Sequence, residues 1–144
     1  MAALFGKKED DSTPGSPPAA EEIARLEGLP LAQLAAEVMD RAFGPNGPGA
    51  PGRPGTIEAP GLSDARLRLN DVAGVVTPAF TATSDVTEQL RIANLVAEGL
   101  QALELAGLIR VTWRGGTEDF SATRRGRGAQ AGGTVGESVS RVLG

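Results

Sequence analysis

The sequence contains no cysteine and no histidine, and the two absences together remove most protein chemistry. Disulfide bonds, Cys/His zinc sites, thiolate nucleophiles and imidazole bases are all excluded. Carboxylates remain, but the adjacent acids Glu118 and Asp119 would point to opposite faces of a strand. The only lysines, Lys7 and Lys8, belong to no phosphate-binding loop. The sequence therefore predicts a protein that is not an enzyme and that needs neither a metal nor another cofactor.

Long apolar runs are absent as well. No stretch reaches the roughly 18 consecutive apolar residues that a membrane-spanning helix needs. The first residues, MAALFGKKEDD, lack the apolar centre of a secretory signal. We therefore expect no membrane association and a cytoplasmic location.

The charge that is present is unevenly distributed. The net charge is −4, but residues 1–107 carry 8 basic and 15 acidic side chains, whereas residues 108–144 carry 6 arginines and 3 acids. The two parts therefore have net charges of −7 and +3. The acidic body should repel a polyanion, and the basic C-terminal part should attract one.

Glycine and proline, 30 residues together, cluster in segments that divide the chain. Residues 1–20 are polar and rich in proline, which predicts a disordered tail. Residues 21–125 are predicted to form one domain, interrupted by a Gly/Pro-rich loop at 44–55. Residues 126–144 are predicted to be a flexible, Gly-rich tail with a short amphipathic end.

Apolar periodicity predicts helices in the body. One short helix spans 19–27, and a stronger one follows Pro30 and ends at Gly44. A possible strand at 56–58 precedes another helix, capped by Ser63 or Asp64 and ended by Pro78.

The longest predicted helix begins near Val86, after the variant capping box of Asp85 and Glu88. Its apolar residues repeat at helical spacing as far as Leu103. Gly99 lies in the middle of this helix, where we expect it to admit a closely packed neighbouring helix.

A β-hairpin is predicted to follow, with strands at 108–113 and 118–122 around Gly115 and Gly116. Ile109, Val111 and Trp113 share one face of the first strand. We expect Trp113 to be part of the core; the alternative is an exposed tryptophan that stacks on a base.

The run from helix to hairpin resembles the end of winged helix-turn-helix domains, mainly over residues 86–127. The matching residues are Leu103, Ala106, Gly107, Leu108, Ile109, Trp113, Gly115, Gly116, Phe120, Thr123, Gly126 and Arg127. The resemblance implies an α+β, mainly α fold, in which a three-helix core carries a C-terminal two-stranded wing.

In DNA-binding members of that family the third helix enters the major groove. The resemblance therefore makes Gln89, Arg91 and Asn94 candidate base-reading residues. The polar positions of the helix nevertheless carry a net charge of −2, which opposes phosphate. The arginines of the wing and of the segment after it are the stronger candidates for contact with the DNA backbone; they are Arg110, Arg114, Arg124, Arg125 and Arg127.

Two functions are therefore left open. The first is a small winged-helix regulatory protein that binds DNA, as a homodimer held by the first helix or by the stripe of Val135, Val139 and Val142. The second is a protein-interaction or adaptor module on the same scaffold, with an acidic helix and a basic wing that suit a partner of mixed charge.

Overall fold

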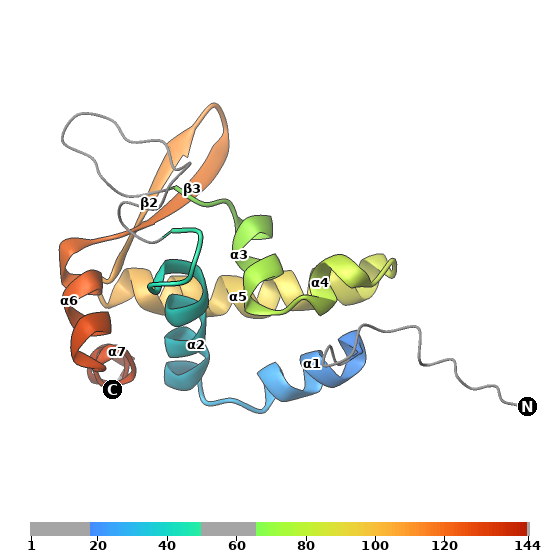
Figure 1. Cartoon of the computed structure of the whole chain (residues 1–144), viewed down its shortest axis with the longest axis horizontal. Helices are drawn as coiled ribbons and strands as arrows, with labels where there is room; N and C mark the ends of the chain where they lie inside the picture. The colour runs from blue at the N-terminus through green and yellow to red at the C-terminus, as the bar shows by residue number, and fades with distance from the viewer. Residues whose placement is uncertain (1–17, 50–65, 144) are drawn as a thin grey trace, which may run out of the picture.

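The computed structural model describes residues 18–49 and 66–143, which form a helical body with one projecting β-hairpin (Figure 1). The elements in chain order are α1 (Ala19–Glu27), α2 (Leu31–Phe43), α3 (Leu69–Val76), α4 (Ala79–Ala82), α5 (Val86–Leu105), β2 (Ile109–Arg114), β3 (Thr117–Ala122), α6 (Arg124–Gly132) and α7 (Val135–Leu143). The predicted α+β, mainly helical fold class is confirmed. Most of the predicted disordered tail, part of the Gly/Pro-rich loop and the strand at 56–58 lie outside the described residues.

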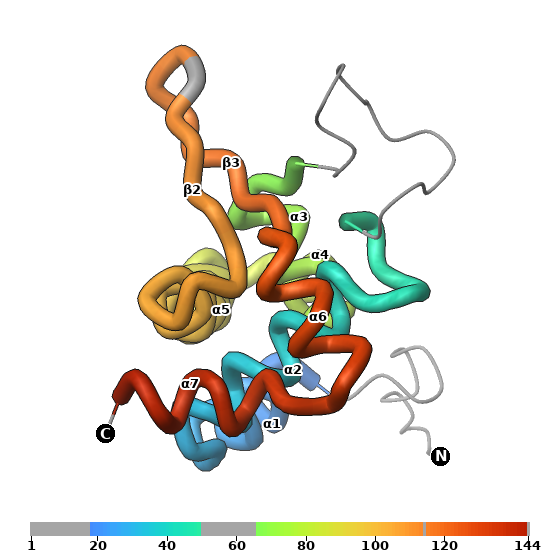
Figure 2. Tube along the Cα trace, turned by 90° about the vertical axis from the view of Figure 1, so that its left-hand side faces the viewer, coloured from blue at the N-terminus to red at the C-terminus, as the bar shows by residue number. Residues whose placement is uncertain are grey.

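The core forms where α2 crosses α5. Val38 of α2 and Val96 of α5 are both fully buried. A Cβ atom at Gly99 would lie only 3.0 Å from Cγ2 of Val38, so glycine is what allows the two helices to approach. The sequence-based interpretation of Gly99 is confirmed. In Figure 2, α5 is viewed nearly end-on, and the hairpin stands away from the helices.

The N-terminus of α5 has the cap that the sequence predicted, with one change. The Asp85 carboxylate accepts hydrogen bonds from the backbone N–H groups of Thr87 (2.9 Å) and Glu88 (3.4 Å). The Glu88 carboxylate does not return to the backbone of Asp85. The Glu88 carboxylate instead accepts a hydrogen bond from the hydroxyl of Thr83 (2.6 Å). The hydroxyl oxygen of Thr83 in turn accepts from the backbone N–H of Asp85 (3.1 Å). Thr83 is therefore inserted into the capping box.

Helix α3 begins later than predicted, because the chain before it is extended and pairs with the hairpin. Leu67 and Phe120 exchange two backbone hydrogen bonds of 2.8 and 2.7 Å. The helix then starts at Leu69, and the Asp71 carboxylate accepts from the backbone N–H of Arg68 (3.1 Å). Its apolar face is formed by Val72, Ala73 and Val76, which are all buried.

The hairpin has a regular antiparallel register, from Ile109 opposite Ala122 to Arg114 opposite Thr117. Both turn residues, Gly115 and Gly116, have positive φ angles of 56° and 82°. This is the glycine-favoured two-residue turn that matches the twist of the strands.

Residues 126–144 were predicted to be a flexible tail, but 124–143 fold into two helices. Val135 and Val139 are buried, and α7 packs against α2. These valines therefore belong to the core of the chain, so the prediction that they form a dimer contact is wrong; Val142 is 50 % exposed. The amphipathic end is too short to be stable alone, but the apolar surface of α2 supplies the missing partner.

Helix α6 forms despite its glycines because the start of the helix is held by specific contacts. The Thr123 hydroxyl donates to the carbonyl oxygen of Gly107 (2.6 Å) and accepts from the N–H of Gly126 (2.9 Å). Gly126 lies so close to the Leu108 carbonyl group that a Cβ atom there would overlap its oxygen. The glycine that weakens the helix in isolation is therefore needed for its packing.

An ion-pair cluster fixes α1 to the body. The Arg25 guanidinium donates two hydrogen bonds of 3.0 Å to Glu22, and bonds of 2.9 and 2.7 Å to Glu37 of α2. Glu22 is only 6 % exposed. The hydrogen bonds from Arg25 hold the pKa of the Glu22 carboxyl below its usual value, although burial acts in the opposite direction. The two carboxylates in turn raise the pKa of Arg25.

Candidate interaction surfaces on α5 and the hairpin

The predicted base-reading residues of α5 are largely engaged within the chain. Gln89 is half-buried, and its side-chain amide donates to the backbone carbonyl oxygens of Phe80 (3.3 Å) and Thr83 (3.1 Å). This amide closes the C-terminal end of α4. It is therefore not directed at a ligand in this conformation.

Arg91 is exposed but paired. One of its guanidinium nitrogens lies 2.6 Å from a carboxylate oxygen of Glu27 in α1, and the side chains are 54 % and 46 % exposed. Asn94, one helical turn further on, is exposed. Of the three predicted residues, Asn94 alone presents a side chain that the described part of the chain leaves without a hydrogen bond.

The predicted arginines lie at the other end of α5. Arg110 is exposed on β2, Arg124 and Arg125 are exposed in the first turn of α6, and Arg127 is half-buried in the same helix. Arg114 is the last residue of β2. Fourteen residues separate Arg91 from the end of α5, which corresponds to roughly 21 Å along the helix axis. The structure therefore divides the predicted site into two separate regions.

The exposed face of α5 forms a stripe that combines two leucines with one glutamate and two neutral amides. Its members recur at helical spacing, and they are Leu90, Asn94, Glu98, Gln101 and Leu105. Leu90 and Leu105 are 59 % and 67 % exposed. Both leucines lie within the predicted helix, but the sequence alone did not show which of its apolar residues would be exposed.

The expectation that Trp113 is part of the core is wrong, because its side chain is 66 % exposed. Val111 and Phe120 form a cross-strand pair under α5, whereas Trp113 and Glu118 form the next pair toward the turn on the same face of the hairpin. The body covers the base of the hairpin and does not reach this pair. The acidic cross-strand partner was the signal in the sequence, since a core tryptophan would more often face an apolar residue.

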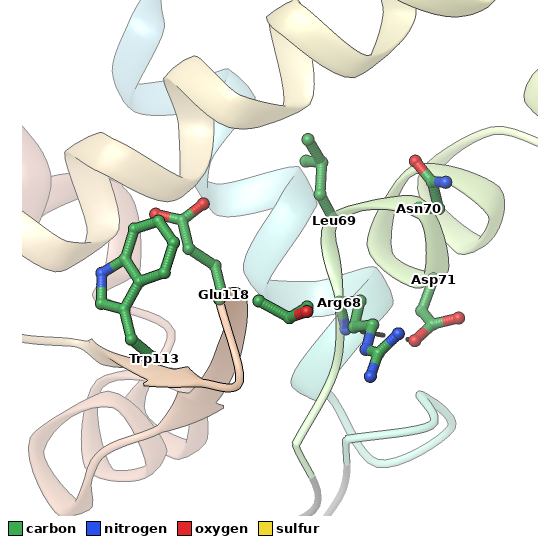
Figure 3. Close-up of a pocket in the computed structure, with 8 residues that line it drawn as sticks. Arg68, Leu69, Asn70, Asp71, Trp113 and Glu118 are labelled. Atoms are coloured by element: carbon green, nitrogen blue, oxygen red, sulfur yellow. Dashed lines mark hydrogen bonds between the residues drawn. The ribbon is translucent and has the colours of Figure 1, made fainter.

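A groove runs beside this pair. Its outer part, about 660 Å³, lies between the hairpin tip and the start of α3, and its lining includes Arg68, Leu69, Asp71, Trp113 and Glu118. Figure 3 shows the Trp113 ring and the Glu118 carboxylate side by side on the hairpin, with the residues of α3 on the other side.

The inner part of the groove is narrower, about 120 Å³, and continues toward α5. Val111 and Phe120 of the hairpin line it together with Ala97, Gln101 and Glu104 of α5, while Leu69 and Glu118 belong to both parts. The two parts thus form one surface with the stripe on α5. We call this combination, the α5 stripe and the groove, the α5–hairpin face.

The groove contains more negative than positive charge. Arg68 is its one cation among the described residues, and its Nε lies 4.0 Å from a carboxylate oxygen of Asp119. Glu104 and Glu118 form no ion pair within the described part of the chain. This electrostatic environment disfavours phosphate and favours a cation.

Neither a cluster of metal-ligating residues nor a membrane-spanning helix is found where the structure describes the chain. Residues 18–49 and 66–143 contain no group of three or more acidic residues placed to hold a metal ion. None of their helices is long and apolar enough to cross a membrane. Comparison of the chain with models of protein families, with curated proteins and with solved structures finds no match.

Proposed function

We propose that this chain is a non-enzymatic protein-interaction module on a winged-helix-like scaffold, and that its partner binds the α5–hairpin face. The scaffold part of the proposal is supported by the order of elements: α2, the extended residue Leu67, α3, α5 and then the hairpin. The resemblance to winged helices implies three helices followed by a two-stranded wing, and this order, with the short α4 between α3 and α5, fits it.

The observation that carries the functional part is the composition of the exposed face of α5. This helix is described over its whole length, and its single cation, Arg91, is paired with Glu27. Its remaining charged residues are glutamates, and two leucines are more than half exposed. A DNA-reading helix needs donors and positive charge toward phosphate. Exposed apolar groups among acids instead suit a protein partner.

Selection of random displayed peptides on the immobilised full chain tests this proposal. We expect enriched peptides whose binding is lost with Glu98→Lys, a charge reversal in the middle of the α5 stripe. The matched control is Asp40→Lys, a charge reversal at an exposed position of α2, which should leave binding intact. Failure to enrich any peptide, or equal sensitivity to both variants, would argue against the proposal.

DNA binding is a second candidate, and a separate observation favours it. Arg124 and Arg125 lie in the first turn of α6, which contains no acidic residue. Cations are unfavourable at a helix N-terminus, where the helix dipole attracts anions. With the exposed Arg110 at the base of the hairpin, they could contact a few phosphates.

Fluorescence anisotropy with a mixed-sequence DNA duplex at low and moderate salt tests the second candidate. The DNA proposal expects salt-dependent binding that is weakened by Arg124→Ala and Arg125→Ala. Absence of binding at low salt would remove it. Binding that is insensitive to Asn94→Ala would indicate contact through the arginines alone.

A further inference from the structure

The strongest feature that the proposed function leaves unexplained is the exposed tryptophan at the hairpin tip. Trp113 and Glu118 are directly opposite each other on the two strands, so their Cβ atoms lie about 5 Å apart on the same face of the hairpin. Both side chains point from the strands toward α5 (Figure 3). The indole ring and the carboxylate therefore meet a ligand from the same side.

The charges around this pair are complementary to a cation. Glu104 of α5 adds a second carboxylate to the groove, and neither Glu104 nor Glu118 forms an ion pair within the described residues. Arg68, across the groove, already lies 4.0 Å from Asp119. A ligand that brings its own positive charge would supply what the groove lacks.

The apolar residues that line the groove indicate which residues flank the cationic group of the ligand. Leu69 and Val111 are half-buried at the floor of the groove. A nucleic-acid base could stack on Trp113, but the phosphates beside the base would approach Glu104 and Glu118. A polypeptide segment with apolar residues on either side of one cationic side chain meets no such repulsion.

We propose that Trp113 and Glu118 form a recognition site for an arginine side chain, carried by an apolar segment of the partner protein. The inference rests on the proposed protein-interaction function and specifies the chemistry of the partner. Arginine fits better than lysine because its planar guanidinium can stack on the indole while donating two hydrogen bonds to a carboxylate.

Trp113 is the only tryptophan and the chain has no tyrosine, so intrinsic fluorescence reports on this site directly. The probe is the peptide acetyl-Val-Leu-Arg-Leu-Val-amide, and its control contains citrulline, the neutral isostere of arginine. We expect the arginine peptide to shift the Trp113 emission in a saturable manner. The citrulline peptide should bind several-fold more weakly.

Variants of the full chain then locate the binding, measured by anisotropy of the labelled arginine peptide. Trp113→Leu and Glu118→Gln should each weaken it about two- to five-fold, the range for a cation–π contact or an exposed ion pair. Glu137→Gln, which neutralises an exposed acid on α7, should have no effect. Circular dichroism checks that each variant retains its helices.

Three results would overturn the arginine site: no binding of the arginine peptide, equal binding of the citrulline peptide, or full binding to Trp113→Leu. Full binding to Trp113→Leu would mean that the peptide is attracted to the acidic chain as a whole and not to this site. These failures remain distinct from failure of the proposed function. Displayed peptides that require Glu98 but not Trp113 would support the interaction module and remove the arginine site.

Discussion

Two glycines of α6, Gly126 and Gly128, provide a matched test of how the C-terminal part of the chain is held. A Cβ atom at Gly126 would overlap the carbonyl oxygen of Leu108, and it would lie 2.9 Å from the carbonyl carbon and 3.0 Å from Cε of the buried Met39. At Gly128, which is exposed, a Cβ atom would meet nothing within 4 Å. The same substitution should therefore have opposite effects two residues apart.

The expected magnitudes follow from the contacts. Replacing a helical glycine by alanine stabilises a helix by about 0.5–1 kcal/mol, and this is the whole effect expected for Gly128→Ala. Gly126→Ala has the same gain, but α6 must move away from Leu108. That movement adds an overpacking cost of about 1–3 kcal/mol and the loss of one or two hydrogen bonds worth about 1 kcal/mol each. These are the bonds from the N–H of Thr123 to Leu108 and from its hydroxyl to Gly107. The net loss should be about 1–4.5 kcal/mol.

Urea denaturation of the two variants and the unsubstituted chain, followed by circular dichroism at 222 nm, measures these free energies. Tryptophan fluorescence is a poor probe here, because Trp113 is already exposed in the folded state. If residues 126–144 were a flexible tail, neither substitution would change the unfolding free energy by more than a few tenths of a kcal/mol. A Gly126→Ala variant as stable as the unsubstituted chain would refute the contact between α6 and Leu108.

Four further substitutions test the packing of the other helices. Gly99→Ala should destabilise the fold despite the higher helix propensity of alanine, because the added Cβ atom would lie only 3.0 Å from Cγ2 of the buried Val38. Val38→Ala should cost less in that background than alone, and denaturation of both single variants and the double variant measures this coupling. Val139→Ala on α7 should cost about 2 kcal/mol in the same assay, since its side chain is fully buried against the body. Because the pKa of Glu22 is lowered in the folded state, its ionised carboxylate stabilises the fold at pH values above the unfolded pKa of about 4.5, and this contribution is lost as the pH falls through the folded pKa. Glu22→Gln should therefore flatten the dependence of stability on pH between about pH 5 and 3. An unchanged slope would contradict the pairing with Arg25.

Local signals in the sequence predicted the elements that depend on near neighbours. Asp85 marks the start of α5 because its carboxylate caps backbone groups only two and three residues away. The glycines at 115 and 116 specify a tight turn wherever the hairpin lies. Gly99 was recognisable because a glycine in the middle of a long helix has a cost that packing must offset.

Features that depend on distant contacts were not predictable in this way. Leu67 is extended because it pairs with Phe120, far along the chain. The glycines of α6 suggest flexibility until the carbonyl group of Leu108 is placed beside Gly126. Trp113 is exposed because the body ends short of the hairpin tip. The alternation of residues within a strand does not show how far along the strand the helices cover it.

The candidate site was predictable to a similar extent. Charge counting indicated correctly that α5 carries a net charge of −2 and that the C-terminal part carries arginines. It could not show that Gln89 is bonded to the end of α4, or that Arg91 is paired with Glu27 of α1. The groove beside Trp113 joins residues from α3, α5 and the hairpin, so no single stretch of sequence contains it.

The central claim, that the α5–hairpin face binds protein rather than DNA, is tested most directly by a photo-crosslinking amino acid at position 94. Asn94 is exposed in the middle of the α5 stripe, and the same group at the exposed position 33 of α2 is the control. After irradiation in the source cells, we expect a discrete adduct at position 94 that protease destroys, that nuclease leaves intact and that Glu98→Lys removes. A nuclease-sensitive adduct at position 94, or the same adducts from both positions, would contradict it.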